Sequence, residues 1–244
     1  MKIRLVSGLF CSIALLCASQ TVWALRAPRI ESAAVTPPNH LMVEFGHQFQ
    51  QPTSGLKENR QQLTLTQGVA GNQQVDLVVP WRVQQTGGNH AGFGDVVILH
   101  KVGALTASHN GRTLVGGFTT VRLPTSPESR VGKDNYQFTN NLLLTQATEH
   151  STFTLNAGSV IQTHGDEMMR YGAGFQYVWE RFGAFSEILG YTDFQKNGKN
   201  EVVSGLGGIE LLLGKRFTLD LGGEVGITKD ANDWGAFAGG TVTF

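Results

Sequence analysis

FTLDLGGEVGITKDANDWGAFAGGTVTF, residues 217–244, shows the clearest alternation in the chain. In its first half, apolar side chains occupy one parity and polar side chains the other: Phe217, Leu219, Leu221, Val225 and Ile227 against Thr218, Asp220, Glu224 and Thr228. A period of two is typical of a β-strand whose two faces meet different surroundings. After a polar turn at 229–233, residues 234–244 repeat the alternation with smaller side chains and end on Phe244. The pattern predicts two strands, each with one apolar and one ionised face.

The composition of the 244 residues narrows the class of protein. Glycine is abundant, with 31 residues, and 16% of the residues are charged, yet hydrophobic residues reach only 41%. Beyond the N-terminus, no stretch stays apolar for the roughly 18 residues that a membrane-spanning helix needs. The sequence therefore argues against a helical membrane protein.

The N-terminus has the features of a secretory signal peptide. Lys2 and Arg4 precede the apolar run Leu5–Leu16, and Val22-Trp23-Ala24 ends in a small residue suited to cleavage. The apolar run is too short to span a membrane as a helix. We expect residues 1–24 to be removed during export.

Cleavage would also change the cysteine content and the charge. Both cysteines, Cys11 and Cys17, lie in the removed segment, so the exported chain would form no disulfide. Loss of Lys2 and Arg4 lowers the basic residues from 19 to 17 against 19 acidic residues, a net charge of −2. A chain without excess positive charge is a poor partner for a phosphate backbone, so we expect no nucleic-acid binding.

From Leu41 onward the alternation recurs in twelve segments: Leu41–Phe49, Gln61–Gln67, Gln73–Gln85, Gly92–Leu105, Arg112–Leu123, Asn135–Thr148, Ser151–Thr163, Met168–Trp179, Phe182–Phe194, Val202–Leu213, Phe217–Thr228 and Trp234–Phe244. Bacterial outer-membrane barrels have an even number of antiparallel strands, with short turns at one rim and long loops at the other. Short connections such as Glu180-Arg181 and long polar ones such as Gln50–Arg60 and Pro124–Asp134 fit that alternation. Pro80 interrupts one segment and predicts a β-bulge, because proline cannot donate to a strand ladder.

The sequence thus predicts an all-β fold: a transmembrane, antiparallel, up-and-down β-barrel of about twelve strands, of the outer-membrane type. We expect the barrel to span residues 41–244. Residues 25–40 would form a short periplasmic lead-in, which is the only candidate for a plug.

The polar face distinguishes a membrane barrel from a soluble one, which also alternates. It collects ionisable residues in mid-strand, whereas Phe175, Tyr177 and Trp179 follow the apolar face. With lipid outside, such charges can pair in a wet lumen. We expect the following to face the lumen and to be candidates for contact with a solute: Glu44, Asp76, Arg82, Asp95, Lys101, Arg170, Glu187, Glu210, Asp220 and Glu224.

Several short motifs resemble a known family. They are Gly92-Phe93-Gly94-Asp95, Leu123-Pro124-Thr125, Leu155-Asn156-Ala157-Gly158, Phe185-Ser186-Glu187, Leu219-Asp220-Leu221-Gly222 and Asp233-Trp234. Together they resemble the outer-membrane transporter-like family labelled MetA-pathway of phenol degradation. Ser126 stands where that family usually has glycine, so the turn of that loop would differ. The resemblance implies a bacterial outer-membrane barrel for uptake of aromatic or other hydrophobic molecules, and a terminal aromatic residue, Phe244, that the barrel-assembly machinery reads.

One pair of acids invites a specific interpretation. If the loop Gly214–Arg216 joins its strands as a hairpin, Glu210 and Asp220 face each other, and opposed carboxylates repel. Either a cation from Arg82, Lys101 or Arg170 bridges them, or one carboxyl takes up a proton. The pair would then be a structural ion cluster or, alternatively, a selectivity element for a passing solute.

Nothing in the sequence favours catalysis, a metal site or a cofactor. No Gly-x-Ser-x-Gly motif occurs, and the seven histidines are scattered without the spacing of a triad or a zinc site. We expect a channel or transporter for small, hydrophobic or aromatic molecules in the outer membrane, with lipid and the solute as partners. The alternatives are a closed structural or adhesion barrel that acts through its long loops and, less favoured, a membrane-embedded lipid hydrolase.

Overall fold

The computed structural model describes residues 32–52, 58–69, 71–84, 90–107, 112–125, 135–163, 167–193 and 201–244. The signal peptide predicted at 1–24 and most of the loop predicted at Pro124–Asp134 lie outside these residues. No helix in the described part of the chain is long and apolar enough to cross a membrane.

The regular secondary structure of the described residues consists of β-strands alone. These are β1 (Leu41–Pro52), β2 (Glu58–Gly68), β3 (Gln73–Gln84), β4 (His90–Phe93), β5 (Val97–Ala107), β6 (Thr113–Arg122), β7 (Gln137–Ala147), β8 (Ser151–Gln162), β9 (Met168–Trp179), β10 (Phe182–Asp193), β11 (Glu201–Leu213), β12 (Phe217–Gly226) and β13 (Asn232–Thr243).

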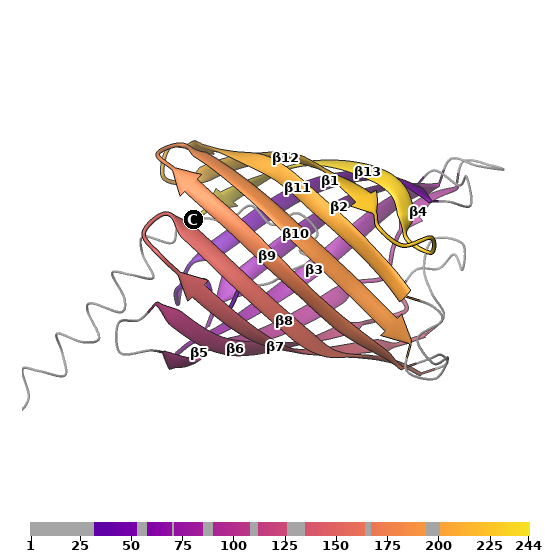
Figure 1. Ribbon diagram of the computed structural model, residues 1–244, viewed down its shortest axis with the longest axis horizontal. Helices are drawn as coiled ribbons and strands as arrows, with labels where there is room; N and C mark the ends of the chain where they lie inside the picture. Colours follow the sequence, from indigo (N-terminus) through magenta and orange to yellow (C-terminus); the bar gives the residue numbers. More distant parts are fainter. Residues whose placement is uncertain are drawn as a thin grey trace, which may run out of the picture.

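The strands close into an antiparallel barrel (Figure 1). Sequential strands pair from β5 to β13, β13 pairs with β1, and β1–β2 and β2–β3 complete the ring. The four-residue strand β4 and the first half of β5 share one place beside β3. The ring therefore has twelve strand positions, which confirms the predicted fold class.

The bulge predicted at Pro80 lies on the neighbouring strand. The pairing Val78↔Val97 ends the contact with β5, and Trp81↔Phe93 begins the contact with β4. Two residues of β3 thus face three residues, 94–96, of the partner, and Gly94 N–H donates to the Pro80 carbonyl at 2.6 Å. The extra residue switches the inward parity from even numbers in β4 to odd numbers in β5.

The two rims differ as the sequence predicts. The start of β1 and the C-terminal residue Phe244 lie at the rim of tight turns, which include 148–150, 180–181 and 214–216. The loop predicted at Gln50–Arg60 is wrong in extent, because β1 runs to Pro52 and β2 begins at Glu58. Polar side chains such as Gln50 and Arg60 extend these strands because their inward face is itself polar.

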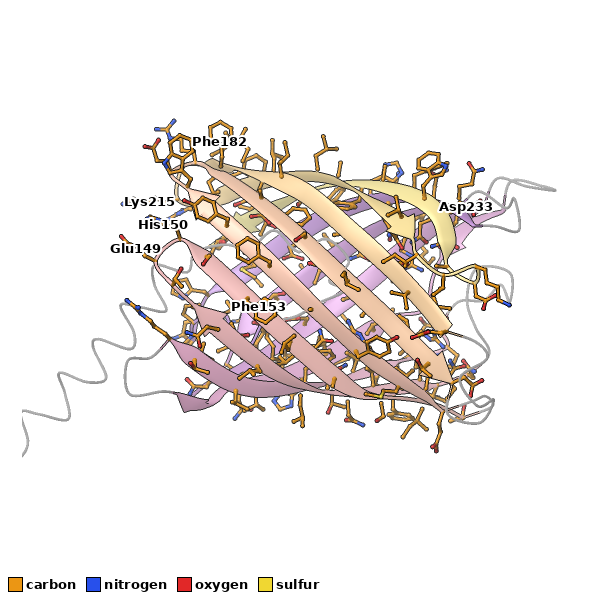
Figure 2. All side chains as sticks on the ribbon, in the orientation of Figure 1. Glu149, His150, Phe153, Phe182, Lys215 and Asp233 are labelled. Carbon is orange, nitrogen blue, oxygen red and sulfur yellow. The ribbon has the colours of Figure 1, made fainter. Side chains whose placement is uncertain are left out.

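The outer face of the barrel is apolar. Phe45 is 70% exposed, whereas its neighbour Glu44 is 1% exposed and points inward. Exposed aromatic side chains gather near both rims: Phe153, Tyr177, Trp179, Phe182 and Phe244 near the tight turns, and Trp81, Phe93, Tyr136, Phe138 and Trp234 near the loops. Figure 2 shows side chains standing out from the wall between Lys215 at one rim and Asp233 at the other. An apolar belt between two aromatic girdles is typical of outer-membrane barrels.

The described part of the lead-in, residues 32–40, reaches into the barrel from the rim of tight turns. Ala33 N–H donates to Thr145 Oγ1 at 2.8 Å, and Thr36 N–H donates to Gln74 Oε1 at 2.9 Å. Ala33 also packs with Leu99, Phe118 and Leu143, three inward-facing residues. The described residues 32–40 of the predicted plug candidate therefore occupy part of the lumen, against β3, β5, β6 and β7.

Candidate functional site

The structure places most of the predicted lumenal residues on the inner face. Eight are buried inside the barrel: Glu44, Asp76, Asp95, Lys101, Arg170, Glu210, Asp220 and Glu224. Glu187 is half-buried and lines a cavity. The side chain of Arg82 lies outside the described side chains. Whether any of them contacts a solute stays a prediction.

Glu210 and Asp220 are paired directly across the β11–β12 hairpin, as the sequence predicts. Both are buried, and Gln176 Nε2 donates to Glu210 Oε2 at 2.6 Å from β9. Gly183 is on β10, the strand between Gln176 on β9 and Glu210 on β11, and a Cβ at Gly183 would lie 2.8 Å from the Glu210 carboxylate. The Glu210 carboxylate therefore reaches over a glycine to bond to the second strand along.

Other predicted lumenal residues form contacts elsewhere on the inner face, from β3 to β9. The guanidinium of Arg170 lies over the ring of Phe118, 5.6 Å from its centroid. Asp95 lies 3.8 Å from Arg122 Nε, and Gln74 donates to both oxygens of Asp76 at 2.8 and 3.1 Å. Because Gln74 also accepts from Thr36, the Asp76 carboxylate is linked to the segment inside the lumen.

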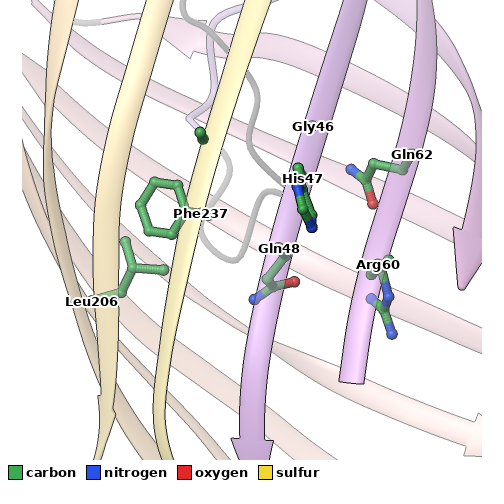
Figure 3. A pocket seen from close by; sticks show the side chains of 8 residues that line it. Gly46, His47, Gln48, Arg60, Gln62, Leu206 and Phe237 are labelled. Carbon is green, nitrogen blue, oxygen red and sulfur yellow. The ribbon is translucent and has the colours of Figure 1, made fainter. Parts of the chain in front are cut away.

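Two cavities lie on the part of the wall formed by β10–β13, β1 and β2. The larger, about 530 Å³, has the inward-facing residues Glu187, Leu206, Glu224 and Gly235 in its lining. The smaller, about 20 Å³, has Leu206 and Phe237 on one side and Gln48, Gln62 and Arg60 on the other (Figure 3). Leu206 borders both cavities, so they adjoin each other along the lumen.

An apolar cluster that was not predicted from the sequence lies on the inner face of the wall, beside the cavities. Phe185, Leu206 and Phe237 are buried together, and the two rings are 6.1 Å apart at their centroids with planes 31° apart. We call these three residues the aromatic shelf. The parity of Phe175, Tyr177 and Trp179 predicts aromatic side chains on the lipid side, whereas Phe185 and Phe237 point inward.

Two glycines make the aromatic shelf possible. Phe185 is paired with Gly208, Gly208 with Gly222, and Gly222 with Phe237, in one row across four strands. A Cβ at either glycine would clash with the ring paired to it. Each ring therefore lies flat over a glycine. The sequence signal that could have identified the shelf is the pair Gly208 and Gly222, each of which is the register partner of a phenylalanine.

The inward charges are unevenly distributed. On β10–β13, β1 and β2, the described inward-facing ionisable residues in the strands are seven acids (Glu44, Glu58, Glu187, Asp193, Glu210, Asp220 and Glu224) and one base (Arg60). On β3–β9, with the bulge between β4 and β5 included, they are two acids (Asp76 and Asp95) and three bases (Lys101, Arg122 and Arg170). Among the described residues, no group of three or more acids, histidines or cysteines is placed to hold a metal ion.

Comparison with known proteins bears on the fold alone. No protein-family model matches the chain, and no curated protein matches it. The chain is similar in structure to the COG4313 outer membrane channel from Pseudomonas putida F1, with 10% identity, a TM-score of 0.66, and 91% of this chain and 100% of that chain covered.

It is also similar to the KdgM porin in complex with disordered oligogalacturonate, with 8% identity, a TM-score of 0.62, and 83% and 99% of the two chains covered. For the NanC porin the identity is 11%, the TM-score 0.61, and the coverage 83% and 98%. The chain therefore has the fold of a twelve-position outer-membrane β-barrel.

Proposed function

We propose that the chain is an outer-membrane channel that conducts small molecules along the β10–β2 side of its lumen. The observation that carries this proposal is the cavity of about 530 Å³ beside Leu206, which the acidic side chains of Glu187 and Glu224 help to line inside a closed barrel with an apolar outer face. A lumen that served only as structural core would have no need of inward carboxylates, which are costly to bury.

The outer-membrane location belongs to the same proposal. Support comes from the exposed apolar belt with aromatic girdles and from the fold shared with outer membrane channels. The exposed ring of Phe244 at the tight-turn rim agrees with recognition of the C-terminal residue by the barrel-assembly machinery. A cleaved signal peptide at residues 1–24 would direct the chain there.

We further propose that the solutes carry apolar or aromatic groups. The aromatic shelf offers them an apolar surface inside a polar lumen. KdgM was solved with an oligogalacturonate, which is an acidic sugar polymer. The seven acids on the cavity side of this lumen would repel such a polymer, so we expect a different class of solute. Membership of the phenol-degradation family would agree with an aromatic one.

Conductance in planar bilayers tests the channel directly. The refolded chain should give discrete current steps once heat-modifiable gel mobility confirms that the barrel has formed. Liposomes that contain it should swell faster in small neutral aromatic solutes than in sugars of similar mass. A folded barrel that conducts nothing and swells no liposome would contradict the proposal and favour a closed structural barrel.

A further inference from the structure

We infer that the aromatic shelf and the carboxylates beside it form a binding site for small organic cations that carry an aromatic ring. The inference rests on the proposed function and names the class of solute. It depends on three features: a flat apolar surface, carboxylates close to that surface, and a cavity large enough for a ring.

The apolar surface is preformed. Phe185 and Phe237 lie over Gly208 and Gly222, so the sheet backbone supports both rings from below. Leu206 lies beside them and faces both cavities. A rigid aromatic surface binds another ring by offset or edge-to-face contact with little loss of conformational entropy.

Carboxylates flank this surface on the side of the larger cavity. Glu187 is paired with Leu206 in the β10–β11 register, and Leu206 with Glu224 in the β11–β12 register. Two carboxylates therefore lie on either side of the leucine in one row. Gln50 Nε2 donates to Glu224 Oε2 at 3.2 Å, which holds that carboxylate in place.

The surrounding charges favour a cation over an anion. Arg60 is the base that faces the smaller cavity, and its Nη2 lies 3.4 Å from Glu58 Oε1. If Arg82, the register partner of Arg60, is counted as a second base, the acids on this side still outnumber the bases seven to two. An ammonium group on the solute would gain charge-assisted hydrogen bonds from the acids, and a carboxylate would be repelled by most of them.

The cavity has the volume for such a solute. Pockets for small molecules span about 300–1,000 Å³, and the larger cavity measures about 530 Å³. A benzylammonium ion placed there would lay its ring against Leu206, at the edge of the shelf, and direct its ammonium group toward Glu187 and Glu224.

Titration calorimetry on the refolded chain separates the contributions of ring and charge, with three probes: benzylammonium, benzoate and propylammonium. Benzylammonium should bind more tightly than either of the others, by about 3- to 10-fold over propylammonium for the added ring contact. Equal affinities for the two ammonium ions would overturn the role of the shelf, and tighter binding of benzoate would overturn the role of the carboxylates.

Matched variants localise the site. Phe237→Leu should remove most of the preference for benzylammonium over propylammonium, whereas Phe45→Leu, the same change on the outer face, should not. Glu187→Gln with Glu224→Gln should weaken both ammonium ions about tenfold, and Glu149→Gln in an exposed turn should weaken neither. Unchanged affinities in the lumenal variants would place binding elsewhere and contradict the inference.

This test does not depend on ion flow. Binding without current would leave the inference standing and overturn the channel proposal. Current without selective binding would leave a channel and overturn the inference.

Discussion

The two sides of the lumen are built differently although both belong to one continuous sheet. The β3–β7 side is filled, because residues 32–40 pack there against Leu99, Phe118 and Leu143. The β10–β2 side is hollow, because a cavity of about 530 Å³ lies beside Leu206. Charge follows the same division: acids dominate the hollow side, and bases slightly outnumber acids on β3–β9.

The difference teaches that alternation alone does not determine what a barrel encloses. Every strand contributes inward side chains at period two, but the volume of each side chain and the presence of a further segment decide whether that region is core or path. In this barrel, one side of the lumen behaves as a core and the other as a candidate path.

Deletion of residues 25–39, which empties part of the filled side, should have the largest effect on conductance. Without residues 25–39, the space beside Phe118 and Leu143 opens, and the single-channel conductance should rise by roughly twofold or more, because conductance follows the open width of a pore. Planar-bilayer recordings of the intact and shortened chains measure this rise. An unchanged conductance would mean that the segment lies outside the conducting path in the membrane.

Phe118→Ala should cost about 3–5 kcal/mol of unfolding free energy, because it leaves a hole in a packed cluster and removes the ring beneath Arg170. The urea midpoint of the folded barrel in liposomes gives this value. Phe237→Ala, on the hollow side, should cost less because its ring already borders a cavity. Equal costs would show that the two sides are packed alike.

Glu210→Gln with Asp220→Asn tests whether the paired acids act on passing ions. The double variant should lower the preference for cations in a salt gradient, because two of the seven inward acids on the hollow side are lost. The reversal potential measures that preference. An unchanged potential with an intact fold would leave the pair a structural role only.

Thr145→Val should have the smallest effect. It removes the hydroxyl that accepts from Ala33 N–H, a contribution of about 1 kcal/mol. We expect a slightly lower urea midpoint and more frequent brief openings in recordings. Thr154→Val is the control: it removes the hydroxyl that is hydrogen-bonded to Thr145 Oγ1 at 3.2 Å, a bond that Thr145→Val also breaks, whereas no hydrogen bond from Thr154 to residues 32–40 is seen in the described part of the chain.

Much of the fold could be predicted because it depends on local pattern. The register of Glu210 and Asp220 followed from a three-residue turn, and the inward direction predicted for Asp95 and Lys101 held although Asp95 lies within the bulge opposite Pro80. The strand ends at Gln50 and Arg60 were missed because polar side chains suit a loop and a lumenal face equally well.

The candidate site was only partly predictable. Its acids were found by parity, but the shelf was not, since an inward phenylalanine breaks the rule that apolar residues face lipid. Phe185 and Phe237 turn inward over Gly208 and Gly222. The two phenylalanines are on β10 and β13, at the two ends of a row across four strands, and such a row is visible only once the register of every hairpin is known. The position of residues 32–40 depends on tertiary packing, which no periodicity encodes.

The most direct test of the two-sided lumen is thiol modification during single-channel recording. The chain's cysteines, Cys11 and Cys17, both lie in the segment that we expect to be removed, so a single new cysteine can be placed on either side of the exported barrel. A charged methanethiosulfonate reagent should reduce the current through Glu187→Cys, beside the larger cavity, and leave the current through Asn141→Cys, on β7, unchanged. Block at position 141 with none at 187 would place the path on the filled side and contradict the division.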